Sequence, residues 1–262
     1  MELELQGKVA VVTGASKGIG LAVTRALVRE GVKVVAAARD TTLELNELVT
    51  QGQVLSVQLD LGTPDGPTRL VAQALEAYGT LDILINNVGA VRPRTGGFLT
   101  LTDDEWLWGL NINFLSAVRT TRAALPALIA QGTSTIVNTC SVNAILPDPL
   151  VIEYSAAKAA LLNFSKALSK EVGRLGVRVN TVSPGPVSTD LWLGQDGVAA
   201  TVSRASGRTA EEVARQATSG TATGRFTRPE EVANLIVLLA SRVVGNVTGA
   251  DFMIDGGLVQ TI

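Results

Sequence analysis

Short runs of apolar, largely β-branched residues alternate with longer stretches of helical periodicity along almost the whole chain. The runs predict seven strands, at residues 9–13, 33–37, 54–57, 81–86, 134–138, 178–182 and 251–254. Helical spacing is found in the stretches at 19–30, 67–78, 103–129, 154–175 and 229–240. Continuous apolar strands that alternate with helices are typical of a parallel sheet. We therefore predict a single doubly wound α/β domain over residues 1–262, with a seven-stranded parallel sheet and helices on both faces.

Three Thr-x-x-Glu sequences predict where helices begin, because this pattern forms the capping box of a helix N-terminus. They start at Thr102, Thr209 and Thr227. The segment 188–225 differs from the rest of the chain in being rich in Gly, Ser, Thr and Ala around an apolar group at 191–193. We predict that this segment is a long irregular connection that acts as a lid over a site, with a variable surface insertion as the alternative.

The chain contains no histidine and a single cysteine, Cys140. The lack of histidine excludes Ser-His-Asp and Cys-His catalysis and every His-ligated metal site. One cysteine cannot form an internal disulfide or a Cys-rich zinc site, so we expect no metal. Proton transfer must therefore use Tyr, Lys, Asp, Glu, Ser or a bound water.

The charge balance and the hydropathy of the chain limit which partners it can bind and where it is located. The 22 Lys and Arg residues nearly balance the 24 Asp and Glu residues and form no basic cluster, so we expect no nucleic-acid partner. No apolar stretch reaches the roughly 20 residues of a membrane helix. The N-terminal residues are acidic where a signal peptide is basic, so we expect a cytoplasmic protein without membrane contact.

A glycine-rich turn joins the first predicted strand to the first predicted helix. Gly14, Gly18 and Gly20 are spaced Gly-x-x-x-Gly-x-Gly, which differs from both the Gly-x-Gly-x-x-Gly fingerprint and a P-loop. Glycines allow the backbone to approach a phosphate, and a helix N-terminus directs N–H groups at it. The turn therefore predicts a pyrophosphate site, with tight chain reversal alone as the alternative.

Preceded by Thr13, this turn resembles the nucleotide-binding motif of the classical short-chain dehydrogenases/reductases, a family with a Rossmann-type fold. Residues 86–89 resemble the family's Asn-Asn-Ala-Gly motif with Val in place of Ala, and residues 255–257 match a C-terminal signature. The resemblance spans residues 6–258. It implies cofactor contacts by Gly14, Ser16, Lys17, Gly18, Ile19, Gly20, Arg39, Asp60, Leu61, Asn87, Gly89, Tyr154, Lys158, Pro184, Gly185, Val187 and Thr189.

The end of the second predicted strand bears on which dinucleotide binds. A carboxylate there would bind the ribose 2′-OH of NAD, but the matching position is Ala38. Arg39 follows it, and Lys17 lies in the glycine turn, so two cations would suit a 2′-phosphate. We therefore favour NADP(H), and NAD(H) remains possible if both cations are solvated or Asp40 neutralises Arg39.

Tyr154 and Lys158 are four residues apart at the start of a predicted helix, so they share one face. A nearby ammonium favours phenolate, so we expect Lys158 to lower the pKa of Tyr154 and allow proton exchange near neutral pH. The family resemblance implies that Ser141 holds the substrate oxygen and that Asn113 holds a water that links Lys158 to solvent. The expected catalytic residues are Asn113, Ser141, Tyr154 and Lys158.

The resemblance, with these residues in place, implies an oxidoreductase that transfers hydride reversibly between NADP(H) and a secondary alcohol or ketone, with Tyr154 as general acid and base. The alternatives are an NAD(H)-dependent dehydrogenase of the same family and a dinucleotide-binding regulator without catalytic activity. An enoyl reductase spaces its Tyr and Lys more widely, and an extended-branch epimerase or dehydratase needs a Gly-x-x-Gly-x-x-Gly turn and a longer chain.

The substrate is expected to be a small, mostly hydrophobic molecule, because the predicted pocket lining is mostly apolar. We expect contacts from Ser141, Asn143, Tyr154, Leu191 and Trp192, with further lining by Ala144, Ile145, Leu146, Val91 and Arg92. Arg92 and Arg94 follow the fourth strand and are expected to be solvated rather than to bind an anion. The helices at 103–129 and 154–175 carry apolar residues on more faces than packing on one sheet needs. Because members of the family pair these helices, the resemblance implies a homotetramer, or a homodimer.

Overall fold

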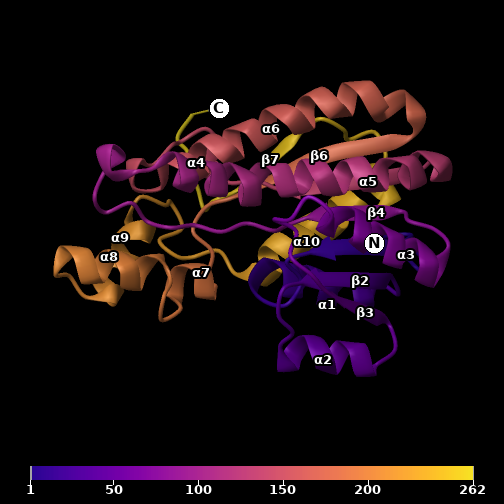
Figure 1. Cartoon of the computed structure of the whole chain (residues 1–262), viewed down its shortest axis with the longest axis horizontal. Helices are drawn as coiled ribbons and strands as arrows, with labels where there is room; N and C mark the ends of the chain where they lie inside the picture. Colours follow the sequence, from indigo (N-terminus) through magenta and orange to yellow (C-terminus); the bar gives the residue numbers. More distant parts are fainter. Residues whose placement is uncertain (1, 262) are drawn as a thin grey trace.

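The computed structural model describes residues 2–261 and contains one sheet in which all neighbouring strands are parallel (Figure 1). The strands are β1 (Val9–Thr13), β2 (Lys33–Ala38), β3 (Val54–Gln58), β4 (Ile83–Asn86), β5 (Ser134–Thr139), β6 (Val177–Pro184) and β7 (Asp251–Ile254). Their order across the sheet is β3-β2-β1-β4-β5-β6-β7. The predicted Rossmann-type fold with seven strands is confirmed. In such sheets ligands bind beyond the carboxyl ends of the strands where the order reverses, here between β1 and β4.

Helices cover both faces of the sheet, because successive strand residues point to opposite sides and both sides are apolar. Ala10 and Val12 of β1 belong to one core, and Val9 and Val11 belong to the other. The first core includes residues of α1 (Gly18–Arg29), α2 (Leu43–Thr50) and α10 (Pro229–Ala240). The second includes residues of α3 (Gly66–Tyr78), α5 (Ser116–Gln131) and α6 (Ile152–Val172).

The predicted helix at 103–129 consists of three pieces. The helix α4 (Asp103–Leu110) continues through a π-helical turn, Asn111–Leu115, into α5. Such turns occur frequently at functional sites, and Asn113 lies within this one. The predicted strands and the other predicted helices are present with ends that agree within three residues, whereas the sequence analysis missed α2.

The segment 188–225 is largely helical, so its prediction as an irregular connection was wrong. It contains α7 (Asp190–Leu193), α8 (Val198–Ser206) and α9 (Ala210–Ser219). Val198, Val202 and Val213 form a small apolar core of their own, against which Trp192 packs. This core supplies the apolar contacts that stabilise short helices in a segment of polar composition. In Figure 1 these helices project to one side of the sheet.

Two of the three predicted capping boxes are present, at Thr102 with Glu105 and at Thr209 with Glu212. The third is displaced by one residue: the backbone N–H of Arg228, not of Thr227, donates to a carboxylate, which belongs to Glu231 (2.8 Å). Thr227 is unavailable as the cap because its backbone forms a parallel bridge with Val187.

Within residues 2–261, no helix has the length and apolar character needed to cross a membrane. The same residues contain no cluster of three or more His, Cys, Asp or Glu side chains that would hold a metal ion.

The buried hydroxyl of Thr13, at the end of β1, ties β1 to β4. It donates to the carbonyl of Ile85 (3.3 Å) and accepts from the backbone N–H groups of Asn87 (2.8 Å) and Val88 (3.1 Å). The side-chain amide of Asn87 donates in return to the carbonyls of Thr13 and Gly14. These bonds fix the glycine turn relative to the segment that follows β4.

We predict that Thr13→Val lowers the free energy of unfolding by about 2–3 kcal/mol, because valine has a similar shape but leaves two backbone N–H groups without their acceptor. Urea denaturation measures the change. Thr50→Val is the matched control, because the Thr50 hydroxyl only caps an exposed helix end. Equal stability of Thr13→Val and the wild type would contradict this role of the hydroxyl.

Candidate active site

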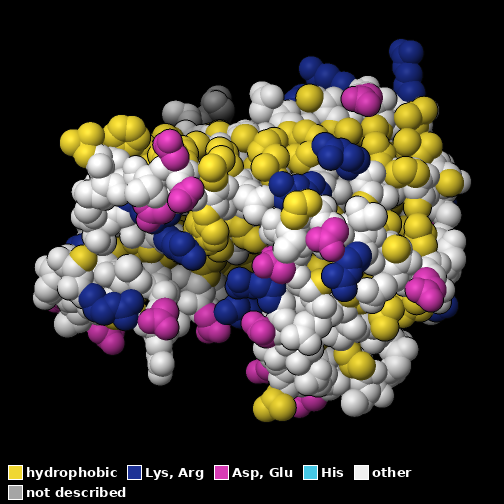
Figure 2. All heavy atoms as spheres, viewed as in Figure 1, with side chains coloured by type: hydrophobic (Ala, Val, Ile, Leu, Met, Phe, Trp, Pro, Cys, Tyr) yellow, Lys and Arg dark blue, Asp and Glu magenta, His cyan; other side chains and the backbone are white. Residues whose placement is uncertain are grey.

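A cavity of about 1150 Å³ lies beyond the carboxyl ends of the strands. Its walls come from the β1–α1 turn, the ends of β2, β4, β5 and β6, the start of α6, and the segment with α7–α9. Figure 2 shows the molecule hollowed between the lobe that carries these three helices and the rest, with apolar side chains gathered along the hollow. The volume exceeds that of a typical single-ligand pocket.

The glycine turn forms one end of the cavity. Gly14 and Gly18 have φ angles of +66° and +55°, which favour glycine. A Cβ on Gly20 would lie 2.1 Å from the carbonyl oxygen of Gly14, so only glycine allows helix α1 to pack this closely against the turn. Gly20 does not itself line the cavity, whereas Gly14, Ser16, Lys17, Gly18 and Ile19 do.

The N-terminus of α1 is open toward a ligand. Its N-cap residue, Lys17, makes no side-chain capping bond, and the first turn contains no acidic residue. The N–H groups of this turn therefore retain their capacity to bind an anion, and the helix dipole favours one.

Lys17 and Arg39 both line this end of the cavity and are exposed. Among residues 2–261 neither forms an ion pair, and Asp40 does not pair with Arg39. Asp60 lies nearby, and its carboxylate accepts from the backbone N–H of Gly62 (2.8 Å). The remaining predicted cofactor contacts that line the cavity are Leu61, Asn87, Gly89, Tyr154, Lys158, Pro184, Gly185, Val187 and Thr189.

Ser141, Tyr154 and Lys158 lie together in the cavity wall, as expected from the spacing of Tyr154 and Lys158 and, for Ser141, from the family resemblance. Ser141 follows β5. Its hydroxyl accepts from the backbone N–H of Asn143 and donates to the side-chain oxygen of the same residue, each at 3.2 Å. The Lys158 ammonium is buried, lies 5.6 Å from the centre of the Tyr154 ring, and donates to the carbonyl of Thr139 (2.7 Å).

The pKa of Tyr154 corrects one expectation. Burial raises it from 10.0 to about 12, while the Ser141 side chain acts in the lowering direction. Burial also lowers the pKa of Lys158, because desolvation disfavours its charged form. The chain alone therefore favours the protonated phenol, and the predicted lowering of the tyrosine pKa by Lys158 does not occur in it.

Asn113 is buried and does not line the cavity. Its side-chain oxygen accepts from the backbone N–H of Ala90 (2.9 Å), and its side-chain amide donates to the carbonyls of Ala90 (2.9 Å) and Gly109 (3.1 Å). A Cβ on Gly89 would lie 3.2 Å from Asn113 Oδ1 and 3.5 Å from Lys158 Nζ, so these two side chains lie close together behind Gly89. The side chain of Asn113 thus fixes the start of the β4–α4 segment to α4, and we call this set of hydrogen bonds the Asn113 clamp.

The opposite end of the cavity is mostly apolar. Asn143, Leu146, Leu191 and Trp192 line it as expected, and the Trp192 ring packs edge-on against Phe226. Ala144 and Ile145 do not line it, which corrects the predicted lining. The cause is the 3₁₀ turn Val142–Ala144, after which Ile145 is exposed.

Arg94 is not solvated, contrary to expectation. Its side chain is 9% exposed and pairs with the carboxylates of Glu105 and Glu153. Arg92 is exposed but stacks its guanidinium over the Trp108 ring (3.8 Å to the ring centre) at the cavity. Sequence reasoning missed Trp108 and Glu153; the latter's position directly before Tyr154 was the only available signal.

Comparison with known proteins agrees with this geometry. Residues 8–196 match the short chain dehydrogenase family, to which the chain therefore belongs. It is 34% identical to the oxidoreductase YvaG of Bacillus subtilis over the full length of both chains. It is also 33% identical to 3-oxoacyl-[acyl-carrier-protein] reductase FabG of Thermotoga maritima, over 98% of this chain and 100% of that one.

Among solved structures, L-sorbose reductase from Gluconobacter frateurii, complexed with NADPH and L-sorbose, has a TM-score of 0.91 and 31% identity over 100% of both chains. The chain is an oxidoreductase of this family, and two of its relatives, FabG and L-sorbose reductase, are reductases that act on carbonyl or alcohol groups.

The raised pKa of Tyr154 can be tested by optical titration, because the chain has only two tyrosines. At pH 10 we expect equal phenolate absorbance from the wild type and Tyr154→Phe, since Tyr154 remains protonated in the folded chain. A difference should develop as the pH approaches 12. Tyr78→Phe, which leaves Tyr154 as the sole tyrosine, provides the complementary titration.

The same shift makes stability depend on pH. Because folding favours the neutral phenol, the contribution of Tyr154 is fully present below about pH 10 and is lost as the pH rises toward about 12. An excess of phenolate in the wild type at pH 10, relative to Tyr154→Phe, would contradict the raised pKa.

Proposed function

We propose that this protein catalyses reversible hydride transfer between NADP(H) and a secondary alcohol or ketone on a mostly hydrophobic small molecule. The observation that carries the proposal is the convergence of Ser141, Tyr154 and Lys158 on the cavity that the glycine turn also lines. One cavity thus offers both an uncapped helix N-terminus that favours an anion and a phenol that can donate a proton.

The residues present fit a dinucleotide. Gly14 and Gly18 adopt the positive φ angles of a phosphate-binding turn, and α1 begins without a side-chain cap. Lys158 and Asn87 would face the nicotinamide half, and Val187 and Thr189, in the segment between β6 and α7, would hold its carboxamide. A bound nicotinamide supplies or accepts the hydride.

The protein residues move and hold the proton. In the direction of reduction, the Ser141 and Tyr154 hydroxyls would donate hydrogen bonds to the carbonyl oxygen and stabilise its developing negative charge. Tyr154 then transfers its phenolic proton to that oxygen, and its high pKa keeps this proton in place at neutral pH. Lys158 would replace the proton from a water that links it to solvent. Asn113 would hold this water through its side-chain oxygen, which accepts from the N–H of Ala90 and has a second lone pair.

We infer that the segment 188–225 closes over the substrate as a lid. Its helices carry Leu191 and Trp192 into the cavity wall, and its own small core allows it to move as a unit. We also propose that the protein forms a homotetramer (or homodimer) and is located in the cytoplasm.

Tyr154→Phe tests the reaction. We expect kcat to fall by about 10²–10⁴-fold, because the general acid is lost, while NADPH affinity is unchanged. Turnover is measured on a panel of ketones, quinones, steroids, sugars and β-ketoacyl thioesters, with NADPH and NADH in parallel. Tyr78→Phe, a change on the far helix α3, should retain full activity; near-normal turnover by Tyr154→Phe would refute the assignment.

The preference for NADP(H) rests on Lys17 and Arg39, the two unpaired cations at the adenosine end of the proposed site. We expect Lys17→Ala and Arg39→Ala each to weaken NADPH binding by about ten- to a hundredfold, since each removes a charged hydrogen bond to the 2′-phosphate. NADH binding should be unchanged. Fluorescence titration measures both.

Arg29→Ala is the matched control for this test, because Arg29 lies at the other end of α1 and outside the cavity. A wild-type preference for NADH, or an unchanged ratio of the two affinities in both variants, would overturn the proposed cofactor choice.

A further inference from the structure

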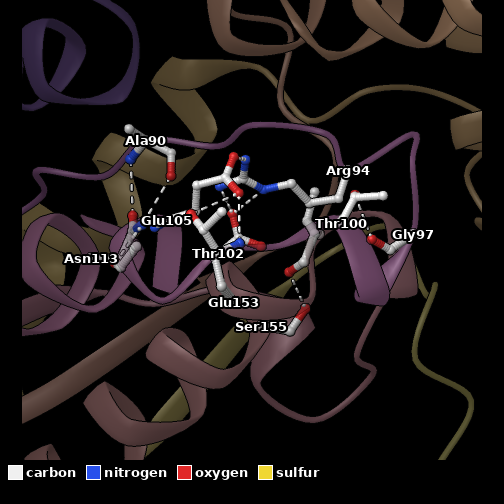
Figure 3. Close-up of polar contacts among 11 residues, drawn as sticks. Ala90, Arg94, Gly97, Thr100, Thr102, Glu105, Asn113, Glu153 and Ser155 are labelled. Carbon is white, nitrogen blue, oxygen red and sulfur yellow. Dashed lines mark hydrogen bonds and ion pairs between the residues drawn. The ribbon is translucent and has the colours of Figure 1, made fainter. Parts of the chain in front are cut away.

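A charged group is buried between two carboxylates beside the proposed active site. Arg94 Nη1 donates to Glu105 Oε1 (2.6 Å), and Arg94 Nε donates to Glu153 Oε1 (2.7 Å), which Nη2 also approaches to 2.6 Å. The exposed fractions of the three side chains are 9% for Arg94, 35% for Glu105 and 1% for Glu153. Figure 3 shows the guanidinium directed at both carboxylates.

The three side chains come from three separate elements. Arg94 lies in the segment between β4 and α4, Glu105 lies in the first turn of α4, and Glu153 lies in the first turn of α6, directly before Tyr154. The backbone N–H of Arg94 also donates to the carbonyl of Leu150 (2.6 Å), just upstream of α6. Arg94 therefore joins the β4–α4 segment to the start of the tyrosine helix through both its side chain and its backbone.

Helix packing around Glu153 leaves little freedom. A Cβ on Gly109 would lie 2.6 Å from Glu153 Cγ, so glycine at this point of α4 provides the space that the carboxylate arm fills. The carbonyl of Gly109 accepts from the amide of Asn113, which in turn binds Ala90. Arg94, Glu105 and Glu153 together form what we call the Arg94 cluster. This cluster and the Asn113 clamp both contact Gly109 or its helix α4.

The β4–α4 segment is consequently fixed at two points. Asn113 holds Ala90, and the two carboxylates hold Arg94 (Figure 3). Val91, Arg92 and Pro93 lie between these points and line the cavity.

The cluster is poorly suited to stabilising the fold by itself. Burying an ion pair costs a desolvation penalty, and apolar side chains of similar volume often give equal or greater stability. Here, moreover, Glu153 Oε2 is buried without a hydrogen-bond partner among residues 2–261, because Nε and Nη2 of Arg94 both approach the other oxygen. The guanidinium instead orients the two carboxylates, because its planar, forked geometry sets the angle between them.

We propose that Arg94 is a positioning residue for the reaction: through Glu153 and Glu105 it sets the first turn of α6, and with it the Tyr154 hydroxyl, relative to the cavity wall at residues 91–93. This inference rests on the proposed function. Arg94 acts through other residues and does not touch the reacting atoms. Displacement of the phenol by about 1 Å is enough to slow such a reaction by about a hundredfold.

Arg94→Met with Glu153→Met is the decisive variant, because it replaces the ion pair by apolar side chains and so removes the penalty of a lone buried charge. We expect its urea midpoint and its NADPH affinity to match the wild type. Its kcat should fall by about ten- to a hundredfold, with an increase in KM for the carbonyl substrate. A purely structural role would instead return kcat to the wild-type value once stability is restored.

Arg94→Lys is the second variant, and it keeps the charge but cannot reach both carboxylates as a fork. A fall in kcat in this folded variant supports the proposal, and wild-type kcat in either variant overturns it. Arg69→Met is the matched control, because Arg69 pairs with Asp65 at the surface, with a side chain that is 64% exposed. This control should leave stability, NADPH affinity and kcat unchanged.

The two proposals fail in different ways. If Tyr154→Phe retains activity, the proposed catalytic residue is wrong whatever Arg94 does. If Tyr154→Phe is inactive while the Arg94→Met/Glu153→Met variant turns over at the wild-type rate, the reaction stands and Arg94 has no positioning role.

Discussion

The hydrogen bonds of Thr13 and Asn87 hold together the two chain connections that build the site. At the point where the strand order reverses, the chain leaves β1 toward one face of the sheet and β4 toward the other. The two connections therefore diverge and leave a crevice between them. The Thr13 hydroxyl and the Asn87 amide bridge its base, so the glycine turn and the segment after β4 keep a fixed separation.

The positions of the seven strands along the chain could be predicted because both faces of the sheet are buried. This burial gives continuous apolar runs such as Val9–Thr13. The cavity-lining residues Ser141, Tyr154 and Lys158 could also be placed, because they follow or begin regular elements. Features that depend on distant partners could not. Thr227 fails as a helix cap because Val187 pairs with it, and α8, together with its packing against α9, depends on a small core assembled from separated valines.

Arg94 illustrates the same limit most clearly. An arginine in a connection is solvated by default, since its charge is costly to bury. Its burial here depends on carboxylates 11 and 59 positions along the chain, and on a glycine that admits one of them. No local pattern contains this information. Glu105 was recognised only as part of a capping box, and that role coexists with its ion pair to Arg94.

The burial of Tyr154 and Lys158 and their closeness to each other have opposite effects on the protonation state of the phenol. Closeness favours a phenolate beside an ammonium, whereas desolvation favours the neutral form of both groups. Desolvation dominates in the chain alone, where the ammonium donates to the Thr139 carbonyl rather than stabilising a phenolate. A phenol that retains its proton is useful only if it lies where the acceptor oxygen will be, because its acidity cannot compensate for a poor position. This places the demand for accuracy on the backbone that carries Tyr154. The Arg94 cluster acts on that backbone directly, through Glu153 and the Leu150 carbonyl, whereas the Asn113 clamp fixes the facing β4–α4 segment and meets the cluster at Gly109.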